Sequence, residues 1–344
     1  MTGYYSKSKK QEPHSYKRIQ SELAEGSLKN ILLFYGREKY LIRWACGRVK
    51  ETFVQPASEF FDFVRIDGTA ADAEEIIGAC ETMPMLSERK VILVEDFDES
   101  EGRGERIAEY LKEFPPHALL LLLCDAPDKR KKLYKAAAKY GSTYDFDRLP
   151  APLLRSFLSK RFRAAGKTFD PDLTGLFIDL SGYYDRDSDY TLDNLVNDAA
   201  KVTALSGSRI TAEDIENAVA GNIARDVFAF SDALTSGNRG EALRMLRSLL
   251  EYGENVFKLL GLICSQYETI LAVSEMRGDG LSLTQMKSVL GIHEFRIRKA
   301  LGPASRCDAG KLRRTLMKAY EAERKIKTGA ADPETALELF VAEA

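Results

Sequence analysis

The sequence contains few of the residues that carry redox, metal or acid–base chemistry. Five cysteines occur in 344 residues, at positions 46, 80, 124, 264 and 307, and none of them forms a CxxC pair. Most lie within apolar patterns, which indicates reduced, buried thiols and neither a disulfide framework nor a zinc site. The three histidines have no Cys, Ser or second His at the spacing of a catalytic triad or a metal site. We therefore expect no catalytic residue and no bound metal.

An excess of one charge and long apolar runs are also lacking. The formal net charge is −2 at pH 7, so the overall balance demands neither nucleic acid nor an anionic membrane as a partner. No apolar run approaches the ~20 residues that span a bilayer. The first ten residues include three lysines and lack the apolar core of a secretion signal. We expect a cytoplasmic protein without membrane contact.

A chain of 344 residues is too long for one compact core and suits two or three domains. After a polar, basic arm at 1–14, which we expect to be flexible, residues 15–150 alternate apolar runs with helical patterns. Such runs indicate strands buried on both faces of a parallel sheet. This alternation predicts a doubly wound, mostly parallel α/β domain. The expected strands are 31–35, 60–66, 90–97, 118–124 and 142–146, and the expected helices are 39–53, one after Asp72, 104–114 and 131–140.

Only helical periodicity follows Pro150. Residues 151–221 are expected to form a small helical domain, and residues 222–344 a helical bundle. The longest apolar stripe of that bundle runs over 256–271 and offers, with a later helix, more apolar surface than one small bundle needs. We therefore expect the last domain to assemble with other proteins.

An α/β domain followed by helices invites a search for a nucleotide-binding P-loop after the first strand. That loop needs glycines whose N–H groups wrap the phosphates, a lysine for the outer phosphates and a Ser or Thr for magnesium. The segment from Gly36 to Leu41 reads Gly-Arg-Glu-Lys-Tyr-Leu, with one glycine and a glutamate where phosphate charge would arrive. Glu95 and Asp96 end a strand where an ATPase holds its magnesium ligand, but without a phosphate cradle they are expected to be polar caps. We expect no nucleotide and no other cofactor.

Met83-Pro84-Met85-Leu86 stands between a helix and a strand, where polar turn residues are expected. Methionine is an adaptable side chain that is frequent at binding surfaces, and Pro84 stiffens the backbone that would display it. One interpretation is an apolar plug that inserts into a pocket on a partner protein. The other is that Met83 and Leu86 close the core of their own domain, and the residues alone leave both open.

The run Asp128-Lys129-Arg130-Lys131-Lys132 opens the expected helix 131–140. Lys129, Arg130, Lys131 and Lys132 are candidate contacts to DNA phosphates, because basic side chains neutralise the phosphate backbone. A charge run at a helix start is also commonly a solvated face, so both interpretations stand.

Several segments, in their order and spacing, resemble one known family, the delta subunit of the bacterial DNA polymerase III clamp loader. The resemblance covers nearly the whole chain and rests on residues 33–38, 83–94, 128–135, 291–295 and 323–329. It implies an AAA+-like α/β domain, a small helical lid domain and a C-terminal helical collar domain that joins a five-subunit ring. It also implies a loss of nucleotide binding, in agreement with the degenerate loop after Gly36.

The resemblance further implies a role in DNA replication. Members of the family grip the ring-shaped beta sliding clamp and hold one of its interfaces open, so that the clamp can be placed on primed DNA. The residues that carry over to this grip are Met83, Met85 and Leu86, with Pro84 between them. The implied partners are the beta clamp, the delta prime and gamma/tau subunits of the loader, and primed DNA through the complex. DNA-directed DNA polymerase (nucleotidyltransferase) activity would belong to the holoenzyme as a whole.

The chain departs from the family at two places. Residues 183–190 delay a helix that the family is expected to enter sooner, and Leu86 stands where the family often has an aromatic residue. Two other classes of protein stay open. An ATP-hydrolysing AAA+ relative would need the phosphate loop that is missing, and a helical scaffold or adaptor would have no use for an exposed Met-Pro-Met-Leu loop. A clamp-binding measurement separates the scaffold from the clamp loader.

Overall fold

The computed structural model describes residues 13–100, 102–184, 188–219, 222–251, 255–292 and 294–344. They divide into two units, one of Met1–Leu153 with Thr191–Asn194 and one of Leu154–Tyr190 with Leu195–Ala344. The expected arm 1–14 falls almost wholly outside the described residues, and so does the expected boundary at 221. The division of the helical part into a lid at 151–221 and a collar at 222–344 therefore stays a prediction.

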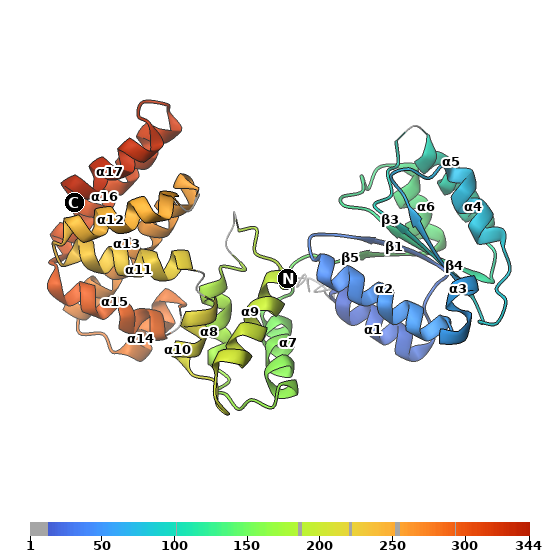
Figure 1. The fold of residues 1–344 in the computed structure, drawn as a ribbon, viewed down its shortest axis with the longest axis horizontal. Helices are drawn as coiled ribbons and strands as arrows, with labels where there is room; N and C mark the ends of the chain where they lie inside the picture. Colours follow the sequence, from blue (N-terminus) through green and yellow to red (C-terminus); the bar gives the residue numbers. More distant parts are fainter. Residues whose placement is uncertain (1–12, 101, 185–187, 220–221, 252–254, 293) are drawn as a thin grey trace, which may run out of the picture. The chain divides into compact units, whose positions relative to one another are not determined.

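The first unit alternates strands and helices along the chain (Figure 1). Its elements are α1 (Ser15–Glu25), β1 (Ile31–Tyr35), α2 (Lys39–Phe53), η1 (Pro56–Ser58), α3 (Glu59–Asp62), β2 (Phe63–Asp67), α4 (Ala73–Glu81), β3 (Lys90–Glu95), α5 (Arg103–Tyr110), η2 (Leu111–Glu113), β4 (Ala118–Leu123), α6 (Lys132–Tyr140) and β5 (Ser142–Asp145).

The five strands form one parallel sheet in the order β2-β3-β4-β1-β5. Strands β1 and β4 are neighbours in its interior, where Leu33 pairs with Leu122. Every residue of β1 is buried, and so are the first five of β3 and of β4. Uninterrupted apolar runs fold this way because helices cover both faces of such a sheet. The predicted doubly wound α/β domain is confirmed.

Helices lie on both faces of the sheet (Figure 1). On one face α4, α5 and α6 bury Ile76, Ile107 and Leu133 against the strands. On the other face α2 packs on the sheet, and α1 packs on α2. Parallel strands all end at one edge, where ligands of such sheets usually bind. The segments that precede β2 and β3 lie at the opposite edge, and these two strands are paired through Phe63 and Val91.

The second strand starts later than the sequence predicted. Residues 60–62 of the expected strand 60–66 belong to the short helix α3, and β2 is Phe63–Asp67. Aromatic residues favour strands, but here Asp62 is turned fully inward while Phe60 is 88% exposed. A strand would have placed residues 60 and 62 on the same face of the sheet, because successive side chains alternate between the two faces. The tertiary contacts of Asp62, described below, override the local preference.

The second unit contains only helices among its described residues, apart from one isolated bridge between Thr168 and Arg209. No helix in the described part of the chain is long and apolar enough to cross a membrane. The helices are α7 (Ala151–Ala164), α8 (Leu173–Ser181), α9 (Leu192–Leu205), α10 (Ala212–Val219), α11 (Asn222–Thr235), α12 (Arg239–Glu251), α13 (Val256–Gly278), α14 (Leu283–Leu290), α15 (Glu294–Arg306), α16 (Ala309–Lys327) and α17 (Pro333–Glu343).

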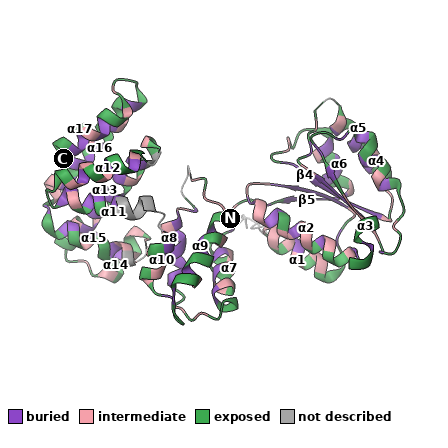
Figure 2. Cartoon of the chain, viewed as in Figure 1, coloured by how far each residue is buried: buried purple, intermediate pink, exposed green. Residues whose placement is uncertain are grey.

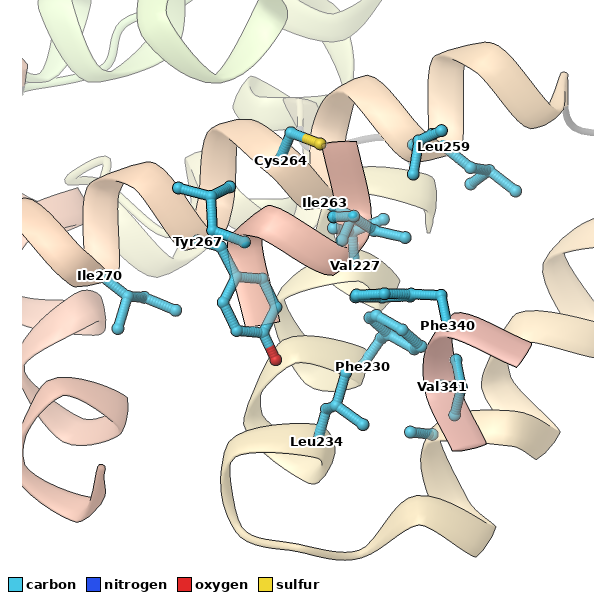
Figure 3. Packing of buried hydrophobic residues seen from close by; sticks show 14 of the residues in the cluster. Val227, Phe230, Leu234, Leu259, Ile263, Cys264, Tyr267, Ile270, Phe340 and Val341 are labelled. Carbon is cyan, nitrogen blue, oxygen red and sulfur yellow. The ribbon is translucent and has the colours of Figure 1, made fainter. Parts of the chain in front are cut away.

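The core of the C-terminal helices is built around α13 (Figure 3). Ile263 and Tyr267 of α13 are each 1% exposed and lie near Phe230 of α11 and Phe340 of α17. Helices α11, α15, α16 and α17 all contact α13, so the bundle buries the stripe at 256–271 itself. The expectation that this stripe is surplus surface for assembly was wrong, because the sequence does not show how many helices surround it. Apolar residues that stay exposed include Phe257, Val289, Met317 and Leu339.

Candidate partner-binding site

The chain leaves α4 through one extended residue, Thr82, and then enters the Met83-Pro84-Met85-Leu86 loop. Asp72 caps the start of α4 by accepting a hydrogen bond from the Glu75 N–H at 2.8 Å. The helix ends at Thr82, whose φ and ψ of −75° and 127° are extended. The chain then passes through Pro84 and enters β3 at Lys90. The loop therefore lies before a strand, at the edge of the sheet away from the usual ligand position.

The apolar side chains of this loop face away from the protein. Met83, Met85 and Leu86 are 64%, 65% and 62% exposed, and Pro84 is half-buried. The alternative in which Met83 and Leu86 close the core of their own domain does not hold. Single exposed apolar residues are ordinary on protein surfaces, but a contiguous group marks an interaction site.

One buried carboxylate fixes the backbone of the loop. Asp62, at the end of α3, accepts hydrogen bonds from three consecutive N–H groups, those of Met85 at 2.6 Å, Leu86 at 3.0 Å and Ser87 at 2.7 Å. Hydrogen bonds to a charged acceptor are about twice as strong as those between neutral groups. The loop is therefore held from beneath while its side chains point outward.

The pKa of Asp62 reflects this arrangement. Burial by itself raises the pKa of the carboxyl group, but the N–H groups of Met85, Leu86 and Ser87 stabilise the charged form and leave the pKa well below its usual range. Asp62 is consequently ionised at every physiological pH, and the loop keeps its charged anchor.

Ser87 supplies a second tether between the loop and the segment before α3. Its hydroxyl lies 2.7 Å from the Ser58 hydroxyl and accepts a hydrogen bond from the Gln55 N–H at 3.2 Å. Ser58 is fully buried and Ser87 is nearly so. The loop and α3 are thus joined into one hydrogen-bonded unit.

Sequence reasoning missed two residues of this surface. Phe60 and Phe61, in α3, are 88% and 48% exposed, and α3 is drawn largely as exposed in Figure 2. The available signal was the sequence Glu59-Phe60-Phe61-Asp62, in which two adjacent aromatic residues are flanked by acids. The predicted strand 60–66 would have placed the two rings on opposite faces of the sheet, and helix α3 exposes both instead.

The segment after β1 cannot hold phosphate in the way that a P-loop does. The Gly36 N–H donates to the Asp125 carbonyl at 3.4 Å, and the Glu38 N–H donates to the Phe146 carbonyl at 2.8 Å. A Cβ on Gly36, whose φ is +122°, would lie 2.7 Å from the Phe146 backbone. The glycine therefore allows two backbone segments to approach, and N–H groups that could meet a phosphate already have partners.

Glu38 occupies the position where phosphate charge would arrive. It is fully buried, and its carboxylate accepts a hydrogen bond from the Leu192 N–H at the start of α9 at 2.8 Å. The N-terminus of a helix attracts anions, so this buried carboxylate caps the start of α9. Lys39 pairs with Asp125.

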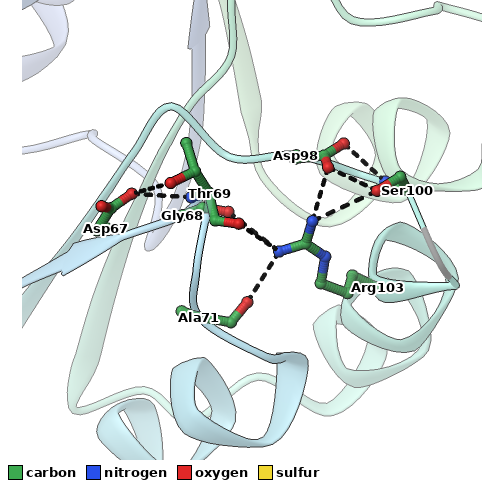
Figure 4. A network of polar contacts seen from close by, with 7 residues as sticks. All are labelled: Asp67, Gly68, Thr69, Ala71, Asp98, Ser100 and Arg103. Atoms are coloured by element: carbon green, nitrogen blue, oxygen red, sulfur yellow. Dashed lines mark hydrogen bonds and ion pairs between the residues drawn. The ribbon is translucent and has the colours of Figure 1, made fainter.

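The acids at the ends of β2 and β3 also have partners within the protein. Glu95 is paired with Arg65, whose Nη2 donates at 2.8 Å. Arg103 donates to the carbonyls of Thr69 and Ala71 at 3.2 and 3.1 Å and pairs with Asp98 at 2.7 Å (Figure 4). This network supports the turn that leads into α4. No group of three potential metal ligands occurs among the described residues.

Helix α6 begins at Lys132 rather than at the expected residue 131. Most of the basic run therefore lies in the turn before this helix, and Lys132 is its first residue. Each of the four cations of the run has a carboxylate partner within the protein. Lys129 lies 3.7 Å from Asp145, Arg130 2.9 Å from Asp128, Lys131 2.8 Å from Glu99 and Lys132 3.2 Å from Glu105. A role in contacting DNA phosphate stays a prediction.

Three buried thiols and His14 have structural surroundings in the part of the chain that the structure describes. Burial raises the pKa of the Cys46, Cys80 and Cys124 thiols to about 12, so they are protonated at neutral pH. His14 caps α1 by accepting from the Tyr16 N–H at 3.1 Å, and His293 lies outside the described residues.

Together these features define a class of protein. It displays an apolar loop whose backbone is held by a buried carboxylate, and it carries this loop on an α/β domain in which the segment after β1 is hydrogen-bonded within the protein.

Two models of one family match this chain. The model "DNA polymerase III, delta subunit" matches residues 32–145, and the model "DNA polymerase III delta subunit, C-terminal domain" matches residues 224–344. They cover more than half of the sequence, and the chain belongs to the DNA polymerase III delta subunit family.

Two relatives identified by sequence agree with this assignment. The chain is 25% identical over 337 residues to the DNA polymerase III subunit delta of Bacillus subtilis (strain 168), covering 94% of this chain and 95% of that one. It is 20% identical over 275 residues to the probable DNA polymerase III subunit delta of Aquifex aeolicus (strain VF5), covering 76% and 75%. A solved structure of the Bacillus subtilis DNA clamp loader delta protein matches 95% of this chain and 98% of that chain, with 22% identity and a TM-score of 0.47.

Proposed function

We propose that this protein is a clamp-loader subunit that binds the beta sliding clamp through Met83, Pro84, Met85 and Leu86. The observation that carries the proposal is the exposure of three large apolar side chains on a loop whose backbone Asp62 fixes. A preorganised loop binds more tightly because little backbone entropy remains to be lost on binding. Side chains of this size, buried centrally in an interface, are typical anchors.

Direct titration tests this proposal. The purified chain and the sliding clamp of the same organism should give saturable binding in calorimetry, at a stoichiometry of one chain per bound clamp. A scaffold or adaptor without a clamp role would give no heat. Absence of binding at concentrations of tens of micromolar would exclude the proposed function.

We further propose that binding holds one interface of the clamp open. A ligand shifts such an equilibrium only as far as it binds the open form more tightly than the closed form. Fluorescent labels on the two sides of one clamp interface should therefore move apart when the chain is added. Tight binding without separation of the labels would limit the protein to tethering the clamp.

Nucleotide binding is expected to be absent. Glu38 is buried and accepts the Leu192 N–H, and the Gly36 and Glu38 N–H groups have carbonyl partners, so no cradle is available for phosphates. Calorimetry with millimolar magnesium-ATP should show only heats of dilution. Saturable heat in the micromolar range would show that the chain binds ATP, and would favour the alternative function of an ATP-hydrolysing AAA+ protein.

We propose that the C-terminal helices, residues 222–344, assemble with the delta prime and gamma/tau subunits. Met317 on α16 and Leu339 on α17 are 60% and 55% exposed, and apolar residues are the usual core of such interfaces. Met317→Glu with Leu339→Glu in the full chain should reduce co-elution with the loader subunits at least tenfold. Clamp binding should stay unchanged. Normal co-elution of the double variant would move assembly to another surface.

DNA is proposed to reach this subunit through the assembled complex, in the cytoplasm. Because Lys129, Arg130, Lys131 and Lys132 each have a carboxylate partner, a phosphate would have to displace an internal ion pair. Such exposed pairs are weak, at about 0–1 kcal/mol, so contact with DNA phosphate stays compatible with the geometry.

A further inference from the structure

Phe60 and Phe61 form an exposed aromatic pair that the clamp-binding loop alone does not explain. Their ring centroids lie 5.1 Å apart in an edge-to-face arrangement, so each ring shields part of the other. Phe60 nevertheless remains 88% exposed. A ring left in water forgoes the favourable free energy that burial would supply.

The helix that carries the pair is held from both ends. Helix α3 has only four residues, which is too short to be stable by itself. Immediately before it, the Ser58 hydroxyl donates to the Gln55 carbonyl at 3.1 Å and contacts the Ser87 hydroxyl. At its end, the Asp62 carboxylate accepts hydrogen bonds from three N–H groups of the loop. The backbone of Phe60 and Phe61 is therefore fixed between two buried anchors.

The Ser58–Ser87 contact and the Asp62 carboxylate also position the loop. Phe61 directly precedes Asp62, so their Cα atoms are ~3.8 Å apart, and the Asp62 carboxylate contacts the N–H groups of Met85 and Leu86. The strands that follow α3 and the loop are paired through Phe63 and Val91. Both apolar groups consequently emerge at one edge of the sheet from one hydrogen-bonded unit.

We propose that Phe60 and Phe61 are a second apolar anchor for the same partner that the Met83-Pro84-Met85-Leu86 loop binds. The proposal rests on the proposed clamp function and deepens it. The occupant is the sliding clamp, because the pair and the proposed clamp-binding loop belong to one hydrogen-bonded unit at one edge of the sheet. Two anchors on one rigid unit set the orientation of the partner as well as its affinity, which a single loop cannot do.

Binding of the full chain to the purified sliding clamp tests the second anchor, with melting measured in parallel. Phe60→Ala with Phe61→Ala should weaken binding about tenfold to a hundredfold, since aromatic anchors dominate interfaces. Phe60→Leu, which keeps most of the apolar surface, should retain most of the affinity. Phe257→Ala removes a ring that is 47% exposed, close to the 48% of Phe61, from another part of the chain and should leave clamp binding unchanged.

The outcomes separate this inference from the proposed function. If the Phe60 and Phe61 variant binds like the wild type while changes in the loop abolish binding, the second anchor is wrong and the clamp function stands. If the wild type itself does not bind, the proposed function fails first. If Phe60→Asp abolishes self-association in sedimentation experiments but leaves clamp binding intact, the pair joins two copies of this chain, and the inference is overturned.

Discussion

Replacing Met85 and Leu86 together with serine is expected to weaken clamp binding about a hundredfold or more. Each side chain contributes roughly 1.5–3 kcal/mol when it is buried in a partner, and each 1.4 kcal/mol is about a factor of ten in affinity. Because both side chains are exposed in this structure, the thermal midpoint should change by less than about 2 °C. Calorimetric titration and thermal melting of the same preparation measure the two effects.

A matched control for this variant is Leu205→Ser. Leu205 is 62% exposed, like Leu86, but lies at the end of α9, far along the chain from the loop. Its substitution should leave clamp affinity within twofold. The opposite pattern for the loop variant, with normal binding and a midpoint several degrees lower, would show that Met85 and Leu86 stabilise the fold. It would refute their proposed role in binding the clamp.

Replacing Asp62 with alanine is expected to damage both the fold and the site. Three hydrogen bonds to a charged acceptor are lost, each worth about 1.5–3 kcal/mol, although water can satisfy part of the exposed loop. We expect a net loss of about 2–4 kcal/mol of unfolding free energy, which lowers the midpoint of a domain of this size by roughly 5–15 °C. Clamp affinity should fall about tenfold or more, because a mobile loop must be ordered on binding.

Asp67→Ala is the matched control for Asp62→Ala. Asp67 also accepts hydrogen bonds from a turn, those of the Thr69 N–H and hydroxyl at 2.9 and 2.7 Å (Figure 4). It is exposed and lies at the carboxyl end of β2, whereas the loop lies at the other edge. Its loss should leave the thermal midpoint almost unchanged, and clamp binding should be unaffected. Equal effects of the two substitutions would refute a specific role of Asp62 in holding the loop.

The pKa of Asp62 fixes the direction of its pH dependence. Its pKa in the folded protein lies below the ordinary value, which is about 3.9 in an unfolded chain. The contribution of Asp62 to stability is therefore complete above about pH 4–5 and is lost as the pH falls through the folded pKa. Exchange protection of the Met85 and Ser87 amides should stay constant between pH 7 and pH 5. Asp62→Asn should reduce that protection at every pH, because its amide offers one acceptor oxygen.

Much of the architecture follows from the sequence because the signals are local. The apolar runs at β1, β3 and β4 and the helices between them were predictable, since strands buried on both faces need uninterrupted apolar sequence. The missing phosphate loop was equally visible, because a P-loop demands particular residues in consecutive positions. The Met-Pro-Met-Leu segment was conspicuous as an apolar stretch where a polar turn was expected.

Only the tertiary structure shows which of the alternatives left open by the sequence the protein adopts. Asp62 lies more than twenty residues from the loop that it holds, and Glu38 meets Leu192 across more than 150 residues. No periodic pattern encodes such contacts. The same limit made α13 look like surplus apolar surface, because the helices that bury it come from distant parts of the chain. The sequence by itself determined which segments are apolar and what chemistry is absent. Only the packing of distant segments determined which apolar side chains stay exposed, because exposure depends on every neighbour in space.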